Sequence, residues 1–597
     1  MAFQTIAEMF LNSVAALPDH PAYFDKIDGE WRQTTYGEAG ATVEALAYGL
    51  AKLGVVPGDR VAILSTNQSK WALSDYAITG LGAATVTVYP TLIAHQIQYI
   101  VENSESRLIF AEDEEQVAKV MEFFGKSPVL KTIVVMNDKT GGEAGVIAFS
   151  DLIKTGKAYR SEAGFDFKER ALSIKPDDLL TLIYTSGTTG NPKGVMLSHK
   201  NLASNINDGR KAIDISEQDV FLSFLPLSHS FERMVGHLAA FSANCTVYFA
   251  ENMETVAANM LEVHPTVVVA VPRFFEKVHG RVLEKVSNDP AIRQKIFYWA
   301  LGVGRQAAKY LTRGQKPTGF LATKFALADK LVFSKLKERV GGKLRYFVSG
   351  GAPLSKDIGE FFASADIPIL EGYGLTETSP VITVNRPELY KFGTVGCTIV
   401  GVEVRIAEDG EILCKGDNVM LGYYKNPEAT AEAIDADSWF HTGDIGHLDE
   451  DQYLVITDRK KNLIVTSGGK NIAPSQLENA LIMSKYIEQC LAIGDRRNFI
   501  SALIVPSQEN LTTWAEKNGL PVTDYTALLQ EPHVQELFQQ EVERNMAGFA
   551  RYEVVKKFAL LPDLWTIAGG EITPSLKVKR KVVEQKYAAQ IEQLYQT

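Results

Sequence analysis

Apolar and polar positions alternate along the chain in blocks that predict strands and helices in turn. In the first 175 residues, short apolar runs such as 61–64 and 84–89 stand between segments whose apolar residues recur at helical spacing. The same rhythm returns further along, with apolar runs at 267–271 and 344–348. This alternation is typical of α/β layers built on largely parallel sheets, because each helix carries the chain back across the sheet. We therefore predict an α/β fold of layered subdomains over most of the chain.

The pattern changes over residues 392–457. Short apolar pieces such as 402–406 and 411–414 are separated there by turn residues, which predicts a small β-barrel-like subdomain. The charged run Asp-Arg-Lys-Lys-Asn at 458–462 follows and reads as a junction, and mixed strand and helix patterns come after it. We predict a large N-terminal domain (1–457), a hinge (458–462) and a small α+β C-terminal domain (463–597).

Composition is that of a globular protein. The hydrophobic fraction is 46% and the charged fraction 22% over 597 residues, a length that needs more than one core. The start of the chain lacks a basic region and a long apolar core, so it predicts an amphipathic helix ended by Pro18, and no run of about 18 apolar residues occurs. The four cysteines are far apart and form no Cys-x-x-Cys pair, which argues against disulfides or a zinc site. We expect a cytoplasmic protein.

A loop rich in glycine and hydroxyl groups follows the apolar run 179–183. Residues 184–194 read Tyr-Thr-Ser-Gly-Thr-Thr-Gly-Asn-Pro-Lys-Gly, and apolar residues follow again, so two short strands should flank the loop. Glycines let the backbone approach a ligand closely, while hydroxyl groups and Lys193 supply donors and positive charge. Because Pro192 precedes the lysine, this is not the P-loop motif. The loop predicts polyphosphate binding; a flexible hairpin without a ligand is the alternative.

A second motif, Glu-Gly-Tyr-Gly-Leu-Thr-Glu-Thr, occupies residues 371–378 after an apolar run. Two glycines loosen the backbone around Tyr373, whose ring can stack on a purine. Thr376 can donate a hydrogen bond to a phosphate. Glu377 offers a hard oxygen ligand for Mg²⁺, which usually takes one or two protein carboxylates together with phosphate oxygens. The two motifs together indicate a nucleotide site.

These motifs resemble the signatures of the adenylate-forming acyl- and aryl-CoA synthetases. Further stretches resemble motifs of that family and follow in the family's order. Ser-Gly-Gly-Ala-Pro-Leu at 349–354 resembles its adenine-side loop, Trp-Phe-His-Thr-Gly-Asp at 439–444 resembles its ribose motif, and residues 458–461 resemble its hinge. Residues 570–580 resemble its C-terminal catalytic segment. The resemblance covers nearly the whole chain.

The resemblance implies a reaction in two steps, in which a carboxylate attacks the α-phosphate of ATP and a thiol, that of CoA, then displaces AMP. It implies that Lys461 is the pivot of a domain rotation, with Mg²⁺ held by Thr185 and Glu377. Implied catalytic residues are Lys193, Thr376, Glu377 and Lys577. Implied ATP and AMP contacts are Thr185, Ser186, Gly187, Thr188, Thr189, Gly190, Lys193, Gly350, Gly351, Ala352, Pro353, Glu371, Gly372, Tyr373, Gly374, Thr376, Asp444 and Arg459.

The acid is suggested by two stretches, 225–233 and 271–277, which look like the long-chain fatty acyl-CoA synthetase branch. So do the long insertion that follows and the Thr-Pro-x-Leu-Lys ending. Residues implied to border the acyl and CoA tunnels are His229, Phe231, Ser467, Gly468 and Gly469; for His229 a core histidine is the alternative. Leu576 stands where many relatives have Gly, which leaves Lys579 as the alternative to Lys577, and Gly469 stands where many have a bulky residue.

Charge is unevenly spread. The net charge is −11, yet residues 277–345 carry 16 Lys or Arg against 4 Asp or Glu, interleaved with apolar side chains at helical spacing. An ordinary solvated face, contact with an anionic membrane at the cytoplasmic side and attraction of CoA phosphates remain open for this segment. A homodimer is a further partner hypothesis, and we expect no nucleic-acid partner.

Three functions compete. We predict a long-chain fatty acid–CoA ligase that uses ATP, a fatty acid and CoA. A fatty acyl-AMP ligase that hands its acyl group to a carrier protein is the main rival, because a pantetheine arm and CoA share the same reactive end. A non-catalytic acyl- or nucleotide-binding protein is the alternative from another class.

Overall fold

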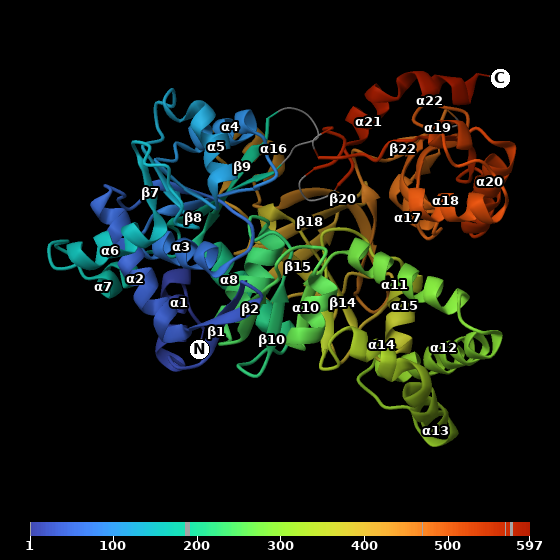
Figure 1. Ribbon diagram of the computed structural model, residues 1–597, viewed down its shortest axis with the longest axis horizontal. Helices are drawn as coiled ribbons and strands as arrows, with labels where there is room; N and C mark the ends of the chain where they lie inside the picture. The colour runs from blue at the N-terminus through green and yellow to red at the C-terminus, as the bar shows by residue number, and fades with distance from the viewer. Residues whose placement is uncertain (1, 186–190, 468–469, 568, 574–576, 597) are drawn as a thin grey trace.

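The computed structural model describes residues 2–185, 191–467, 470–567, 569–573 and 577–596. Two large sheets with helices on their faces form the body of the molecule (Figure 1). The last part of the chain, from α17 to α22, gathers in a separate lobe at the upper right, and α12 and α13 project at the lower right. Among the described residues, no helix is both long and apolar enough to cross a membrane.

One large sheet carries the glycine-rich loop at its edge. The inner strands are parallel, and only the β8–β9 and β9–β19 pairs among its described strands are antiparallel. Strand β3 confirms the predicted strand at 61–64, and β4 confirms the one at 84–89. In sheet order the strands are β19 (Gly422–Tyr423), β9 (Lys193–Ser198), β8 (Leu179–Thr185), β4 (Ala84–Val88), β3 (Arg60–Leu64), β5 (Leu108–Ala111), β6 (Thr132–Val135) and β7 (Val146–Ala148).

The other large sheet carries the second motif. Its centre is parallel, as predicted, and β12 and β13 occupy the apolar runs 267–271 and 344–348. The strands in order are β16 (Cys397–Thr398), β15 (Val381–Val384), β14 (Ile369–Gly374), β13 (Tyr346–Ser349), β12 (Val267–Ala270), β10 (Val220–Ser223), β11 (Thr246–Phe249), β1 (Pro21–Ile27) and β2 (Glu30–Thr35).

Helices cover both sheets and share one large apolar core. The N-terminal helix α1 ends at Ala16, as expected from Pro18. The main helices of this part are α1 (Ile6–Ala16), α2 (Tyr36–Lys52), α3 (Ser69–Gly80), α4 (Ala94–Ser104), α5 (Glu114–Phe124), α6 (Phe149–Tyr159), α7 (Phe167–Leu172), α8 (His199–Ala212), the π-helix η1 (Glu232–Ala239), α10 (Val256–Val263), α11 (Pro272–Ser287), α12 (Ala291–Leu311), α13 (Gly319–Ala328), α14 (Ser334–Arg339) and α15 (Lys356–Ser364).

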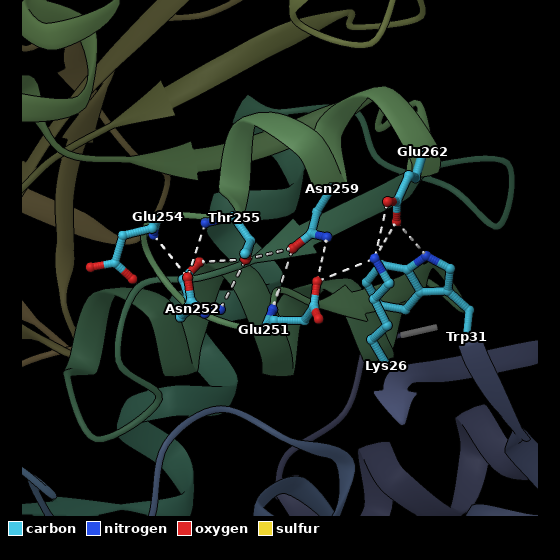
Figure 2. Close-up of polar contacts among 8 residues, drawn as sticks. All are labelled: Lys26, Trp31, Glu251, Asn252, Glu254, Thr255, Asn259 and Glu262. Atoms are coloured by element: carbon cyan, nitrogen blue, oxygen red, sulfur yellow. Dashed lines mark hydrogen bonds and ion pairs between the residues drawn. The ribbon is translucent and has the colours of Figure 1, made fainter. Parts of the chain in front are cut away.

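A polar network fastens the β1–β2 hairpin to α10 at the edge of the second sheet (Figure 2). Lys26 Nζ donates to both carboxylate oxygens of Glu262, at 3.0 and 2.8 Å, and lies 3.2 Å from Glu251. Trp31 Nε1 donates to the same Glu262 at 3.0 Å, and Asn259 donates to Glu251 at 3.1 Å. The hairpin is therefore held to α10 by several charge-assisted hydrogen bonds rather than by one contact.

An antiparallel β unit follows, with β17 and β21 as its outer strands: β17 (Val402–Ile406), β18 (Glu411–Gly416), β20 (Phe440–Leu448) and β21 (Leu454–Arg459). This confirms the predicted change of texture. Strand β21 runs two residues into the predicted hinge.

The chain after residue 462 builds its own apolar cores. Strands β24, β25 and β26 form one sheet, a short β22–β23 hairpin precedes it, and helices surround it, which gives an α+β unit. Its main elements are β22 (Ile464–Val465), β23 (Asn471–Ile472), α17 (Pro474–Ile482), β24 (Ile487–Ile493), β25 (Ile500–Pro506), α18 (Gln508–Lys517), α20 (Pro532–Met546), β26 (Val555–Leu560), α21 (Arg580–Lys586) and α22 (Ala588–Tyr595).

Candidate active site

A cavity of about 1030 Å³ lies where the two large sheets, the β unit and the C-terminal part meet. Its lining contains a polar set and an apolar set. The polar set includes Thr185, Lys193, His229, Ser230, Tyr373, Thr376, Glu377, Tyr423, Arg459 and Lys577. The apolar set includes Ile213, Ile215, Phe221, Met234, Val235, Ala239, Val267, Val348, Val381 and Val384.

Strands β8 and β9 flank the glycine-rich loop, as the sequence predicts. Thr185 pairs with Lys193 at the mouth of this hairpin. The predicted phosphate contacts Ser186, Gly187, Thr188, Thr189 and Gly190 lie outside the described residues. The Lys193 ammonium lies 4.8 Å from the ring centroid of Tyr423, which belongs to the neighbouring strand β19. The cation is therefore held over an aromatic face at the cavity wall.

Glu377 is held by the same tyrosine. The hydroxyl of Tyr423 donates to Glu377 Oε1 at 2.8 Å, and burial followed by the Glu377 charge raises the pKa of that hydroxyl well above its ordinary value. Tyr423 thus stays a neutral donor. Lys193, Tyr423 and Glu377 form one cluster, in which a cation and a carboxylate face the same cavity.

The turn before Glu377 depends on a glycine. A Cβ on Gly374 would lie 1.7 Å from the carbonyl oxygen of Pro380, so only glycine allows the backbone to fold back this closely. The turn places Thr376 beside Ser230, with the two hydroxyl oxygens 3.1 Å apart. Two segments far apart in sequence therefore meet at the cavity.

Asp444 sits beside the second motif. Its carboxylate is buried and accepts from the Tyr373 hydroxyl at 2.7 Å and from Arg459 Nε at 2.9 Å. Strands β20 and β21 bring Asp444 and Arg459 together, because the two residues pair directly across the ladder. The predicted nucleotide residues Tyr373, Asp444 and Arg459 are thus joined in one network.

Lys577 reaches this cavity from the C-terminal part. Its backbone is bonded to Thr573, whose N–H donates to the Lys577 carbonyl at 2.8 Å. Desolvation by the surrounding protein is the largest cause that lowers the pKa of Lys577, and repulsion by Arg459 lowers it further. Asp444 and Glu377 act to raise it. The residue keeps accessible surface toward the cavity, so the lowering reflects enclosure by the two parts of the chain rather than full burial. Lys579 also lines the cavity.

His229 is a neutral imidazole in the lining of the same cavity. Burial, with a further contribution from Lys577, lowers its pKa to about 4. Its Nδ1 accepts from the Phe231 N–H at 3.1 Å, which places the ring proton on Nε2. A Cβ on Gly350 would meet the Phe231 ring at 2.9 Å, so this glycine lets the ring lie against the loop after β13.

The predicted adenine-side loop faces a second, interdomain cavity of about 1930 Å³. Ala352, Pro353 and Glu371 line that cavity, while Gly351, Gly372 and Gly374 line both cavities. Burial raises the pKa of Glu371 to about 8, against the backbone hydrogen bond from Leu354, so its carboxyl is protonated at neutral pH.

The connecting segment 458–462 is tied to both sides. Lys460 Nζ lies 2.6 Å from Asp409 and 2.9 Å from Glu411 in the β unit, and Asp458 accepts from the Ser475 N–H of the C-terminal part at 3.1 Å. Lys461 is exposed and lines both cavities.

Among the predicted tunnel residues, Gly468 and Gly469 are outside the described part of the chain. Ser467 donates to Asn498 within the C-terminal part and is not in the lining of either cavity. The structure therefore brings Lys577, and not Ser467, to the predicted nucleotide residues.

Comparison with known protein families identifies the family of this chain. Residues 10–424 match the AMP-binding enzyme model, and residues 461–597 match the model of the AMP-binding enzyme C-terminal domain. The chain belongs to the AMP-binding enzyme family.

Relatives within this family are similar over almost the whole chain. A protein of Mycobacterium bovis named long-chain-fatty-acid–CoA ligase FadD15 is 38% identical over 97% of this chain and 95% of its own. The peroxisomal long chain acyl-CoA synthetase 7 of Arabidopsis thaliana is 29% identical over 95% of this chain and 82% of its own.

Among solved structures, the anthranilate CoA ligase AuaEII in complex with anthranoyl-AMP matches with a TM-score of 0.72 at 19% identity, covering 98% of both chains. This likeness confirms the adenylate-forming fold, with its large N-terminal and smaller C-terminal domains.

Sequence reasoning missed two contributors to the site of this AMP-binding enzyme. Tyr423 lies in a Gly-Tyr-Tyr stretch that carries no phosphate signature, and only its pairing with β9 brings it to Lys193. Ser230 lies inside the stretch 225–233, but its contact with Thr376 joins positions 146 residues apart.

Proposed function

We propose that this AMP-binding enzyme is a long-chain fatty acid–CoA ligase. The observation that carries the proposal is a single cavity in which Lys193, Glu377 and Lys577 gather beside a wall of apolar side chains. A charged end suits ATP and a carboxylate, and an apolar wall suits an acyl chain. The names of the relatives in Mycobacterium bovis and Arabidopsis thaliana support the same substrate class.

The first step joins two anions. A carboxylate oxygen of the fatty acid attacks the α-phosphorus of ATP, the bond to the bridging oxygen breaks, and pyrophosphate leaves with that electron pair. The chain must hold both anions in line and compensate the growing negative charge. Lys193 and Lys577 supply positive charge, Thr376 donates a hydrogen bond, and Asp444 with Arg459 positions the ribose.

The lysine register is supported by electrostatics. Lys577 responds to the charges of Asp444 and Glu377, and it in turn lowers the pKa of His229. Lys577 also lines the cavity together with Lys193 and Glu377. We therefore assign the catalytic role to Lys577 and keep Lys579 as the residue to test against it.

Mg²⁺ fits the oxygen donors at the loop. Glu377 offers one carboxylate and Thr185 one hydroxyl, a small set of hard ligands that suits an ion completed by phosphate oxygens and water. No group of three or more His, Cys, Asp or Glu residues able to hold a metal is found in the described parts of the chain. Bound there, the ion would supply charge neutralisation on the phosphates.

In the second step, the CoA sulfur attacks the acyl carbonyl carbon. The bond between this carbon and the oxygen that links it to the phosphate breaks, and AMP leaves with that electron pair. The thiol proton goes to solvent or a nearby base. We propose that domains 1–457 and 463–597 move about the hinge 458–462 between the steps, with Lys461 as pivot. The structure holds Lys577 in the cavity and keeps Ser467 away from it, which suits the first step. Rotation would bring Ser467, Gly468 and Gly469 to the thiol entrance.

The apolar wall gives the acyl chain its place. Residues of η1, β10, β12 and β13 line the same cavity as His229 and Phe231, and we assign these two residues to the tunnel mouth. The neutral imidazole of His229 brings no competing charge to the substrate carboxylate.

The test is direct. Purified protein with ATP, Mg²⁺, palmitate and CoA should form palmitoyl-CoA, AMP and pyrophosphate, and acetate should be a poor substitute. Palmitoyl-adenylate that forms but transfers only to a carrier-protein pantetheine arm would favour the fatty acyl-AMP ligase. Absence of palmitate-dependent pyrophosphate release would leave the non-catalytic binding protein.

The basic segment supports a further proposal, peripheral contact with an anionic membrane. Helices α12 and α13 project from the body (Figure 1), and α13 exposes Phe320 at 74% and Leu327 at 50%. Lys324 on the same helix lies 4.6 Å from the Phe320 ring, so charge and apolar surface are adjacent. An exposed apolar helix at the tip of a basic segment suits an anionic lipid surface that carries the fatty acid.

Vesicle sedimentation tests this contact. Binding should need phosphatidylserine and weaken with salt, because each basic residue near the surface contributes roughly 1 kcal/mol of electrostatic attraction. It should also fall when Phe320 and Leu327 are both changed to Ser. Leu172→Ser, which alters an equally exposed leucine at the end of α7, is the control. Equal binding to neutral vesicles would leave a solvated face, with attraction of CoA phosphates as the remaining role.

We further propose a cytoplasmic location and a homodimer. The four cysteines carry no disulfide, which supports the cytoplasmic location. A homodimer is tested by sedimentation velocity at micromolar concentration.

A further inference from the structure

An ion pair links the two sides of the predicted hinge at a distance from it. Arg273, in the first turn of α11, donates from NH2 to Oε1 of Glu488 and to the Glu488 carbonyl oxygen at 2.9 Å. Glu488 belongs to β24 of the C-terminal domain. Among the described residues, no other ion pair joins residues 1–457 to residues 463–597. The helix dipole disfavours a cation in a first turn, so helix electrostatics do not explain why Arg273 is there.

The C-terminal domain is therefore fixed at two points. At the hinge, Arg459 is bound to Asp444, and Lys460 is bound to Glu411. A body attached only at a hinge can rotate about it, whereas a second contact away from the hinge sets the angle of rotation. Arg273 and Glu488 supply that second contact, and both line the interdomain cavity.

The second contact is connected to the catalytic segment. Gln489, next to Glu488 in β24, accepts from the Trp565 N–H at 2.8 Å and donates to the Trp565 carbonyl at 3.1 Å. Trp565 is buried at the start of the segment that leads to Lys577. At the other end, Arg580 donates to Glu478 at 2.7 Å and fixes the segment to α17. A domain held by Glu488 is therefore also bonded to residues on both sides of Lys577, at Trp565 and at Arg580.

We propose that the Arg273–Glu488 pair is an interdomain latch that sets the C-terminal domain in the orientation for adenylation, which makes both residues positioning residues for Lys577. This inference rests on the proposed two-step function. Loss of the latch lowers the population of the adenylation orientation relative to the other, so the ratio of adenylation rate to thioester-formation rate must fall. That ratio is the decisive quantity, because a general loss of stability would lower both rates together.

Four variants test the latch. Arg273→Ala and Glu488→Gln each remove one partner, and the double variant Arg273→Glu/Glu488→Arg restores a pair with its charges exchanged. Arg160→Ala is the control, because it removes an Arg–Glu pair of 2.9 Å that joins α6 to α2 within one domain. Adenylation is measured as palmitate-dependent ATP–pyrophosphate exchange, and thioester formation from palmitoyl-adenylate at saturating CoA.

Each single variant should lower the ratio roughly three- to tenfold, the range for a partly exposed, charge-assisted pair. The exchanged pair should recover most of the loss, and Arg160→Ala should leave the ratio unchanged. An unchanged ratio in both single variants would overturn the latch. So would a double variant as impaired as the worse single one, because it would show that the charges do not act as a pair. A higher KM for CoA in Arg273→Ala alone would instead assign Arg273 to CoA.

Limited trypsin digestion tests the latch without any activity. Cleavage within 458–462, after Arg459, Lys460 or Lys461, should become several-fold faster in Arg273→Ala and Glu488→Gln, and return toward wild type in the double variant. Equal cleavage in all variants would overturn the proposal even if the enzyme used another acid. Faster cleavage of the two single variants, together with no palmitate-dependent exchange in the wild type, would instead contradict the proposed function and leave the latch standing.

Discussion

Lys577 is expected to act in one half-reaction only. Its amine belongs to the lining of a cavity that also contains Glu377, and the charges of Asp444 and Glu377 act on it; in the proposed reaction, negative charge builds up there during attack on the α-phosphate. Removing one well-placed electrostatic donor typically costs about 2.7–4 kcal/mol in the transition state, or roughly 10²–10³-fold in rate. Lys577→Ala should therefore lower kcat and kcat/KM for adenylation by about that factor. Preformed palmitoyl-adenylate with CoA should still yield the thioester at close to the wild-type rate.

The pH profile adds a test specific to the amine. Enclosure lowers the pKa of Lys577 from its ordinary value, so the cationic form is lost at a lower pH than for a solvated lysine. The pKa that governs the basic limb of the kcat/KM profile for adenylation, which reports the free enzyme, should therefore lie below about 10.4. Lys577→Arg keeps its charge at all these values, so its residual activity should lose that limb.

The control is Lys579→Ala, two residues further on in the same cavity lining. The assignment is refuted if Lys579→Ala abolishes adenylation while Lys577→Ala leaves it intact. Equal losses in both half-reactions of Lys577→Ala would show a structural rather than a charge-stabilising role.

Four other variants follow from the structure. Tyr423→Phe removes the donor to Glu377 and should lower kcat/KM for ATP about tenfold, since a hydrogen bond to a charged group contributes about 1.5–3 kcal/mol. Glu377→Ala should lose Mg²⁺-dependent adenylation. Pyrophosphate exchange at the wild-type rate in either variant would contradict the role of the residue that was changed. Lys461→Pro restricts φ at the hinge and should spare adenylation while blocking thioester formation, so equal loss of both steps would count against the pivot. Burial raises the pKa of Glu232 to about 8, so the native state keeps a proton that the unfolded state releases, and this stabilisation is present at acid pH and lost as pH rises toward 8. Glu232→Gln should therefore raise Tm more at pH 9 than at pH 5, and a gain independent of pH would contradict the burial argument.

Local sequence signals predicted the elements that carry the site. The apolar runs beside the glycine-rich loop became β8 and β9, and the run before residue 371 became β14, because period and turn residues act over short distances. Gly374 was predicted to loosen the backbone, and the reason proves to be the close approach of Pro380.

Contacts between distant segments could not be predicted in the same way. Tyr423 reaches Lys193 through a two-residue strand, and Arg273 reaches Glu488 across 215 residues. Neither partner carries a local pattern that names the other. Their positions follow from packing of whole subdomains, which only the folded chain specifies.

A buried ion pair shows how such packing serves the site. Arg233 and Asp75 are each only 2% exposed, and Arg233 donates to Asp75 Oδ2 at 2.9 Å and to Thr181 Oγ1 at 2.6 Å. The pair joins η1 to α3 and to β8, the strand that leads into the glycine-rich loop. His229 lies one turn before Arg233 and accepts from its N–H. The pair therefore fixes the His229 segment relative to the loop.

Stability alone gives no reason for this pair. Desolvation of two buried charges often outweighs their attraction, and apolar residues of similar volume can replace such a pair at no loss of stability or with a gain of about 1–4 kcal/mol. The double change Arg233→Met/Asp75→Leu should therefore keep or raise Tm. If the pair serves to orient η1, adenylation should fall by at least tenfold in the same variant, because misplacement of about 1 Å at a reacting centre costs about 10²-fold. Arg233→Met alone should unfold more readily, since it leaves the Asp75 carboxylate buried without its cation. A stable double variant with full adenylation would show that η1 is oriented by apolar packing instead.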